Sequence, residues 1–295
     1  MNNTSLKQKA SDYLEVCKPR VVAMMLVTVW VGMVLAANSW PQLMLTFATL
    51  TGVGACAASA AAVNHYLDRQ IDLKMRRTQA RPVASGRLAK KEVLSFATCL
   101  ALIGLGVLYL LVNVLTMALT FITLIAYALV YTAYLKRATP QNIVIGGLAG
   151  AAPPLLGWAA VSNSINPSAL LLVLIIFTWT PPHFWALSLY RQEEYKLVKI
   201  PMLPVIYGVF FTKKMIFLYS ILLLLVSELP FIVNMSGIFY GLIALVLGLK
   251  FMYDAYYLLR TNNIALAYKL FRFSITYLLI LFSALLVDHI WRVYA

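Results

Sequence analysis

Acidic residues are scarce in this sequence. Asp and Glu together number 10 in 295 residues, whereas Lys and Arg number 24, so the formal net charge is +14. Charged residues make up only 12% of the chain and hydrophobic residues make up 62%. A soluble domain averages about 25% charged residues. This composition therefore excludes a soluble protein and indicates an integral membrane protein.

Cysteine is also rare, and the three cysteines, Cys17, Cys56 and Cys99, are scattered along the chain. Their spacing fits neither a disulfide framework nor a metal-binding motif. The sequence also contains no low-complexity tract, no obvious internal repeat and no stretch with the composition of a soluble domain. We therefore expect a single membrane-embedded domain over residues 1–295.

Long apolar segments fill most of the chain. A helix needs about 20 apolar residues to span a bilayer, and nine segments approach or reach that length. They cover residues 21–37, 41–63, 93–112, 115–135, 143–161, 169–190, 215–233, 238–259 and 274–291. The expected fold is all-α: a polytopic bundle of about nine transmembrane helices.

The basic residues fall almost entirely into alternate connections between these segments. The N-terminal arm and the connections after the second, fourth, sixth and eighth segments hold 23 of the 24 Lys and Arg residues, which leaves only Arg292 for the other side. Basic loops stay in the cytoplasm, so we expect the N-terminus and these loops there, in a bacterial-type cytoplasmic (inner) membrane.

This topology accounts for most of the positive charge, so we exclude nucleic acid as a partner. Leu35-Ala36-Ala37 loosely resembles a signal-peptide cleavage site. We expect the first segment to be retained, because its removal would leave eight helices and a misplaced set of basic loops.

Three polar residues spaced four apart, Asn64, Asp68 and Asp72, follow the second apolar segment. Four residues is close to one helical turn, so on a continuing helix these side chains stack on one face about 6 Å apart. Their oxygens suit Mg²⁺, which keeps several waters and recruits substrate phosphates. The segment behind them carries basic residues that suit phosphate: Lys74, Arg76, Arg77 and Arg81.

A simpler interpretation remains open for this segment. Two acids and several bases beyond an apolar helix are also what a solvated loop with helix-supporting ion pairs contains. The rarity of acids in this chain, with two of them in register beside Asn64, favours a cation site.

Two further basic-side connections mix charge with aromatic residues, at residues 134–142 and 180–196. Glu193 and Glu194 are the acids of the later one and could complete a cation site begun by Asp68 and Asp72. His183 lies within an apolar segment, where a hydrogen-bonded core residue and a ligand are equally plausible interpretations.

The sequence resembles the intramembrane prenyltransferases typified by 4-hydroxybenzoate polyprenyltransferase. The resemblance rests on Asn64, Asp68 and Asp72 followed by Arg-x-x-Ala-Arg-Pro-x-x-Ser-Gly at residues 77–86. The segments Tyr-Leu-Lys-Arg-x-Thr-x-x-Asn-Ile-Val-Ile-Gly-Gly at 134–147, Trp-Thr-Pro-Pro-His-Phe-Trp at 179–185 and Tyr-Arg-x-Glu-Glu-Tyr at 190–195 are similar to the branch that farnesylates heme. Quinone-type members carry a second Asp-rich signature after the sixth helix, and this chain has none.

The resemblance implies the reaction of heme B, farnesyl diphosphate and water to heme O and diphosphate. Mg²⁺ is the implied cofactor, with ligands from Asn64, Asp68 and Asp72 and from Glu193 or Glu194. The implied catalytic set is Asn64, Asp68, Asp72, Lys136 and Arg137. The implied substrate-binding set is His65, Arg69, Lys74, Arg77, Arg81, Tyr134, Asn142, His183, Tyr190, Arg191 and Lys196.

The residues allow more than one interpretation. Either His65 or His183 could be an axial heme ligand. A prenyltransferase acting on an aromatic quinone precursor is the alternative function, and a transporter is a distant third because charged residues at the bilayer midplane are nearly absent. Membrane lipid is an expected partner, as is a heme-handling protein or a terminal oxidase.

Overall fold

The computed structural model describes residues 6–37 and 40–294, and every regular element within these ranges is a helix. Nine helices in the described ranges are long and apolar enough to span a bilayer, which confirms the expected fold class and the number of spans. They cover Pro19–Ala36, Leu43–Asp72, Lys90–Leu111, Val114–Ala138, Asn142–Ser162, Pro167–Tyr190, Gly208–Ile232, Ile238–Arg260 and Ala265–Val293.

The spans divide into labelled elements, and short helices connect some of them. The first four spans comprise α2 (Pro19–Ala36), α3 (Leu43–Asp72), α4 (Lys90–Leu111), and α5 (Val114–Ile125) with η1 (Ala126–Leu135) and α6 (Lys136–Ala138). The others are α7 (Asn142–Ala151) with α8 (Pro153–Ser162), α9 (Pro167–Tyr190), α12 (Gly208–Ile232), α13 (Ile238–Arg260) and α14 (Ala265–Tyr294). The short helices are α1 (Leu6–Val16), α10 (Gln192–Leu197) and α11 (Leu203–Ile206).

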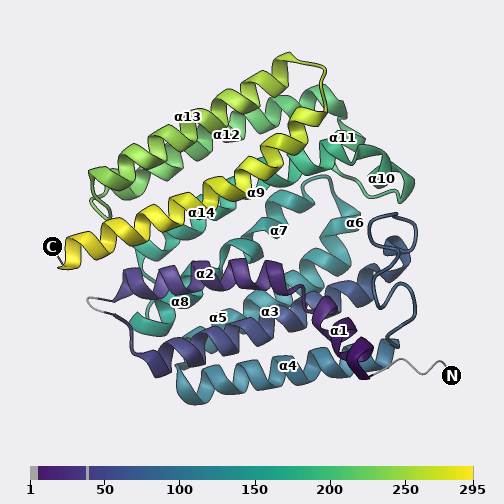
Figure 1. Ribbon diagram of the computed structural model, residues 1–295, viewed down its shortest axis with the longest axis horizontal. Helices are drawn as coiled ribbons and strands as arrows, with labels where there is room; N and C mark the ends of the chain where they lie inside the picture. Colours follow the sequence, from purple (N-terminus) through teal and green to yellow (C-terminus); the bar gives the residue numbers. More distant parts are fainter. Residues whose placement is uncertain (1–5, 38–39, 295) are drawn as a thin grey trace.

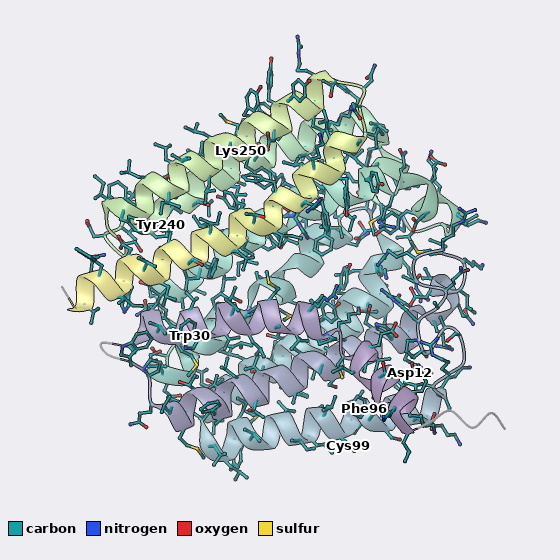
Figure 2. All side chains as sticks on the ribbon, in the orientation of Figure 1. Asp12, Trp30, Phe96, Cys99, Tyr240 and Lys250 are labelled. Atoms are coloured by element: carbon teal, nitrogen blue, oxygen red, sulfur yellow. The ribbon has the colours of Figure 1, made fainter. Side chains whose placement is uncertain are left out.

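The connections gather at the two ends of the bundle. Helices α1, α6, α10 and α11 lie at one end together with the loop after α3, while the connection from α12 to α13 and the C-terminus lie at the other (Figure 1). The end that holds α1 therefore collects the basic connections, as the alternation in the sequence predicts. Asp12 marks this end in Figure 2, and Trp30 and Tyr240 lie nearer the opposite one.

The principal core lies among α9, α12, α13 and α14. Trp185, Phe251, Tyr277 and Leu281 are fully or almost fully buried there. Helices α9 and α14 also pack against each other. This contact holds α14 beside α9.

Helices α2 and α8 approach each other unusually closely. A Cβ atom added at Gly32 would meet the backbone of Pro154, and one added at Gly157 would meet the backbone of Val29. Small residues let backbones approach in membrane bundles, where packing supplies much of the association energy. Glycine at these two positions therefore fixes the contact between the first and fifth spans.

Helix α3 continues beyond its apolar part. The sequence places the end of the second apolar segment at residue 63, whereas α3 runs on to Asp72. The last nine residues of α3 include Asn64, Asp68 and Asp72, and all three are buried inside the protein. Hydropathy marks the end of the apolar segment and not the end of the helix.

The loop after α3 is tied to α1 by an ion pair. Arg87 Nε donates to Asp12 Oδ1 at 3.0 Å, and the Asp12 side chain is only 1% exposed. Arg87 Nη1 also donates to the Ala80 carbonyl at 2.9 Å. These bonds position the segment that carries Arg77 and Arg81 over the end of the bundle.

Candidate active site

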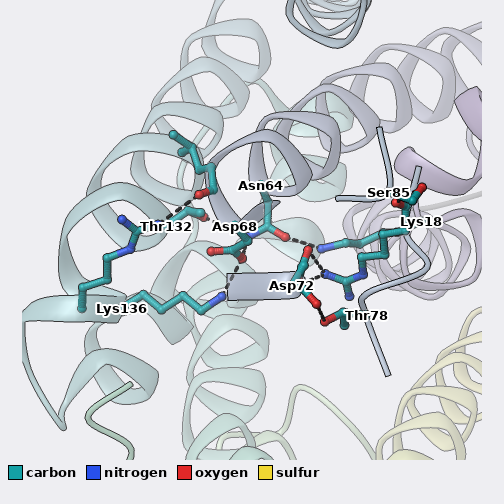
Figure 3. Close-up of polar contacts among 11 residues, drawn as sticks. Lys18, Asn64, Asp68, Asp72, Thr78, Ser85, Thr132 and Lys136 are labelled. Carbon is teal, nitrogen blue, oxygen red and sulfur yellow. Dashed lines mark hydrogen bonds and ion pairs between the residues drawn. The ribbon is translucent and has the colours of Figure 1, made fainter. Parts of the chain in front are cut away.

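Asn64, Asp68 and Asp72 lie on consecutive turns of α3, as their spacing predicts. All three are buried, with exposed fractions of 4%, 2% and 4%. Asn64 Nδ2 donates to Asp68 Oδ2 at 2.9 Å, so the amide and the first carboxylate are in direct contact (Figure 3). Buried carboxylates need partners, because burying an unpaired charge is very unfavourable.

Basic side chains from two other elements supply these partners. Lys136 Nζ, at the end of the fourth span, lies 2.6 Å from Asp68 Oδ2. Arg81 Nη1, from the loop after α3, donates to both oxygens of Asp72 at 3.0 and 2.8 Å. Figure 3 shows Lys136 reaching Asp68. The polar turn at the end of α3 is therefore neutralised by residues from separate parts of the sequence.

Lys18 completes the cluster, although the sequence does not mark it as a site residue. Its Nζ donates to Asn64 Oδ1 at 2.5 Å, and its backbone is left-handed, with φ 50°. Burial, and then the charges of Arg81 and Lys136, lower the pKa of Lys18 to about 7. In the sequence this residue counts only as part of a basic N-terminal arm. Its place directly before Pro19, where the first span begins, is the one signal that separates it from the rest of the arm.

The fourth span contains a π-helix, η1, beside this cluster. Thr132 Oγ1 donates to the Tyr127 carbonyl five residues earlier at 2.8 Å, and it is 3.5 Å from Asn64 Nδ2. A Cβ added at Gly146 on α7 would collide with the ring of Tyr131. Isolated π-helical turns occur often at functional sites, and here the π-helix carries Tyr127 and Tyr131 on the wall of a cavity.

That cavity has a volume of about 710 Å³ and extends from the polar cluster into the bundle. Its polar end is lined by Lys18, Asn64, Asp68, Asp72, Arg77, Arg81, Lys136 and Tyr195. Burial raises the pKa of Tyr195, which keeps its hydroxyl protonated. The rest of the wall is mainly apolar and aromatic and includes Trp179, His183, Phe184 and Phe271. Small-molecule sites have this character, with a few polar groups on an apolar wall.

The two candidate histidines differ in their surroundings. His183 lines the cavity, and its ring is stacked between Trp179 at 4.1 Å and Phe271 at 4.6 Å. His65 is buried next to Asn64 on α3 but is not part of the cavity wall. Both ring nitrogens of His65 are buried without a hydrogen bond to any described residue. Only His183 is placed where it can touch a molecule in the cavity.

The structure does not bring the remaining candidates to the cavity. Arg69 folds over the ring of Tyr66, and Arg137 donates to the Leu67 carbonyl at 3.0 Å. Asn142 is fully buried and donates to the Thr139 carbonyl at 2.7 Å. The candidates that lie outside the cavity are His65, Arg69, Lys74, Tyr134, Arg137, Asn142, Tyr190, Arg191, Glu193, Glu194 and Lys196.

Glu193 and Glu194 lie outside the cavity because each forms an ion pair with a neighbouring base. Glu193 is 84% exposed and pairs with Lys196 at 2.9 Å, and Glu194 pairs with Arg191 at 3.0 Å. These pairs are local contacts at α10, three residues apart, and they direct both acids to neighbouring bases. No group of three or more His, Cys, Asp or Glu side chains is assembled as a metal site within the described ranges.

The donors at the end of α3 nevertheless fit a hard cation. Asp68 Oδ1 is buried and has no hydrogen-bond partner among the described residues. Together with Asp72 and the Asn64 amide oxygen, it offers oxygen ligands of the kind that Mg²⁺ binds through one or two carboxylates and substrate phosphates.

A helical membrane bundle with an acidic turn, basic side chains and a cavity that extends from them into apolar residues is typical of an intramembrane enzyme. The family model described as UbiA prenyltransferase family matches residues 25–283. The chain therefore belongs to the UbiA prenyltransferase family.

Curated relatives are similar over nearly their full length. A protein named protoheme IX farnesyltransferase from Legionella pneumophila (strain Corby) is 62% identical over 94% of this chain and 95% of its own. One of the same name from Idiomarina loihiensis is 52% identical over 94% and 93% of the two chains.

Solved structures share the fold at low sequence identity. A digeranylgeranylglyceryl phosphate synthase structure has a TM-score of 0.80 at 21% identity, covering 96% of this chain and 99% of its own. A UbiA homologue from Archaeoglobus fulgidus, solved with DMAPP and Mg²⁺, has a TM-score of 0.70 at 14% identity and covers 92% and 99%.

Proposed function

We propose that this enzyme transfers the farnesyl group of farnesyl diphosphate to a vinyl group of heme B, with addition of water, to give heme O and diphosphate. One observation carries the proposal: a single cavity joins the acidic and basic cluster at the end of α3 to an apolar, aromatic wall that includes His183. The names of relatives at 62% and 52% identity support heme as the acceptor.

Asp68, Asp72 and the Asn64 amide oxygen would hold Mg²⁺ with the diphosphate. When bound, the ion acts as a Lewis acid on the leaving group. The Archaeoglobus fulgidus homologue was solved with both Mg²⁺ and a prenyl diphosphate, which supports this role. The buried position of the two carboxylates keeps their charge close to the diphosphate and out of bulk water.

The basic side chains bind and stabilise the leaving diphosphate. Lys18, Arg77, Arg81 and Lys136 line the same end of the cavity. As the bond between the farnesyl carbon and the diphosphate oxygen breaks, negative charge grows on that oxygen, and preorganised cations lower the energy of this state. Asp68 and Asp72 hold Lys136 and Arg81 at this end of the cavity, so both cations are in place before the diphosphate binds.

The apolar part of the cavity protects the allylic cation. Tyr127, Tyr131, Trp179 and Phe184 line it and exclude bulk water from the reacting carbon. The heme vinyl group attacks that carbon and forms the new carbon–carbon bond. Water then adds to the cation left on the former vinyl group and loses a proton, which gives the hydroxyl of the product.

We also propose the orientation. The end of the bundle that carries α1, α6 and the loop after α3 faces the cytoplasm of a bacterial-type inner membrane, because the basic connections gather there. The diphosphate then enters from the cytoplasm while the farnesyl chain stays in the bilayer. A heme-handling protein or terminal oxidase in the same membrane would receive the product.

The direct test is a reconstituted reaction. Purified protein is incubated with heme B, farnesyl diphosphate and Mg²⁺, and the pigments are identified by mass. We expect a product heavier than heme B by one farnesyl group and one hydroxyl group. A parallel reaction offers 4-hydroxybenzoate, and prenylation of that acceptor without farnesylation of heme would overturn the proposal.

A further inference from the structure

Ser274 on α14 contacts two aromatic side chains of α9 that lie on the cavity wall. Its carbonyl accepts a hydrogen bond from Trp179 Nε1 at 2.8 Å, and its hydroxyl lies 2.6 Å from His183 Nδ1. Trp179 and His183 are four residues apart and therefore share one face of α9. Ser274 itself is fully buried.

The direction of the bond between Ser274 and His183 follows from a third contact. Ser274 Oγ donates its only hydrogen to the Phe271 carbonyl at 2.6 Å. A hydroxyl has one hydrogen and two acceptor lone pairs, so Oγ can only accept from His183. The proton of the neutral imidazole is therefore on Nδ1, and its Nε2 carries a free lone pair.

That second nitrogen is available to a molecule in the cavity. Nε2 has no hydrogen-bond partner among the described residues. It is not fully buried, so a molecule in the cavity can reach it. His183 lines the cavity, and the flanking rings of Trp179 and Phe271 restrict rotation of the imidazole. A metal-binding histidine shows the same arrangement, in which the second ring nitrogen donates to an outer partner that sets the tautomer.

We propose that Ser274 is a positioning residue that holds the proton of His183 on Nδ1, so that Nε2 serves as an axial ligand to the iron of the heme substrate. The inference rests on the proposed function, since it takes heme as the molecule in the cavity. Iron coordination fixes the heme plane relative to α9, and this orientation determines which edge of the macrocycle faces the Asp68 end of the cavity. No electron or proton transfer accompanies this binding step.

His65 serves as the contrast. Both of its nitrogens are buried without partners, and it is absent from the cavity wall. It lacks both an outer hydrogen-bond partner that would set a tautomer and a path to the heme.

The experiment uses the purified full chain with heme B reduced to the ferrous state and records resonance Raman spectra. Ferrous heme with a histidine ligand shows an iron–histidine stretching band, and hydrogen bonding at Nδ1 raises its frequency. We expect this band in the native protein and its loss in His183→Ala. In Ser274→Ala we expect a lower frequency and roughly 10- to 100-fold weaker heme binding, the usual effect of removing an outer partner of a metal ligand.

Two matched variants separate positioning from a general loss of packing. Ser274→Thr keeps a hydroxyl, so the band should stay at its native frequency. Ser220 is also fully buried and donates to the carbonyl three residues earlier, Phe217, at 2.6 Å. Ser220 is not part of the cavity wall, so Ser220→Ala removes a comparable bond outside the site and should leave the band and the heme affinity unchanged.

The result that would overturn the inference is an absent band in the native protein, a band retained in His183→Ala, or a native frequency in Ser274→Ala. Farnesyl transfer is measured separately by product mass. If the protein farnesylates heme but the band persists in His183→Ala, only the assignment of the axial ligand is refuted. If the bands behave as expected but no farnesylated heme forms, only the proposed reaction is refuted.

Discussion

Lys136 Nζ lies 2.6 Å from Asp68 Oδ2 and so joins the end of the fourth span to the polar turn of α3. The two residues are 68 positions apart in the sequence. Both residues line the cavity, and their side chains taken alone are 15% and 3% exposed. The pair thus places a positive charge beside the carboxylate that we assign to the metal site.

Lys136→Met should lower turnover by roughly 10²- to 10³-fold, the effect of removing one preorganised donor from a developing charge. Lys196→Met is the matched control, because Lys196 lies outside the cavity wall and pairs with the exposed Glu193. Initial rates of heme farnesylation, measured with folded protein recovered by size-exclusion chromatography, check this. Equal losses in the two variants would contradict a role for Lys136 in the cavity.

Lys18→Met should raise the KM for farnesyl diphosphate by roughly 10- to 100-fold, because a charge-assisted hydrogen bond contributes about 1.5–3 kcal/mol. The KM for heme should stay near its native value, since Lys18 lies at the polar end of the cavity. Lys7 on α1 is exposed, so Lys7→Met controls for the charge of the N-terminal arm. A rise in the KM for heme alone would refute the assignment.

Gly146→Ala should lower the free energy of unfolding by about 1–3 kcal/mol, the usual effect of overpacking. The added methyl group would meet the ring of Tyr131, whereas one added at Gly150 on the same helix has no neighbour within 4 Å. Gly150→Ala should therefore be neutral or stabilising. Thermal unfolding in detergent distinguishes them, and equal stabilities would show that Tyr131 does not need the space at Gly146.

The orientation can be tested with two cysteine variants in a background where Cys17, Cys56 and Cys99 are replaced by alanine. Gln79 lies in the loop after α3 and Ser164 in the connection from α8 to α9, and both are exposed. These two connections lie at opposite ends of the bundle (Figure 1). A membrane-impermeant maleimide added to intact bacterial cells should modify the Ser164→Cys protein and spare the Gln79→Cys protein. The reverse labelling would place the active site outside the cytoplasm.

The sequence predicted the acidic turn correctly because the four-residue spacing of Asn64, Asp68 and Asp72 needs only a continuing helix to become one face. It also predicted the number of spans from apolar length alone. Apolar length does not predict where each helix ends. Helix α3 continues to Asp72 through polar residues, and their burial depends on contacts with other spans.

Other parts of the site depend on contacts between distant segments and were not predictable. Lys18 belongs to an arm whose basic residues are sufficiently explained by topology, and its contact with Asn64 appears only when α2 packs beside α3. Glu193 has the right chemistry for a metal ligand, but its contact with Lys196 places it on the exposed surface of α10. The π-helix that carries Tyr127 and Tyr131 has no marked sequence signal.

Asp68→Asn tests the central claim most directly, with heme farnesylation measured across a Mg²⁺ titration. Asn removes the negative charge at nearly constant volume, and Asp68 is buried beside Lys136, so size-exclusion profile and melting temperature must accompany the rates. Glu193→Gln is the matched control, a charge removal at an exposed ion pair worth about 0–1 kcal/mol. We predict that folded Asp68→Asn protein shows no turnover at any Mg²⁺ concentration while Glu193→Gln keeps the native rate. A folded Asp68→Asn protein that farnesylates heme at close to the native rate would contradict the metal site and the mechanism built on it.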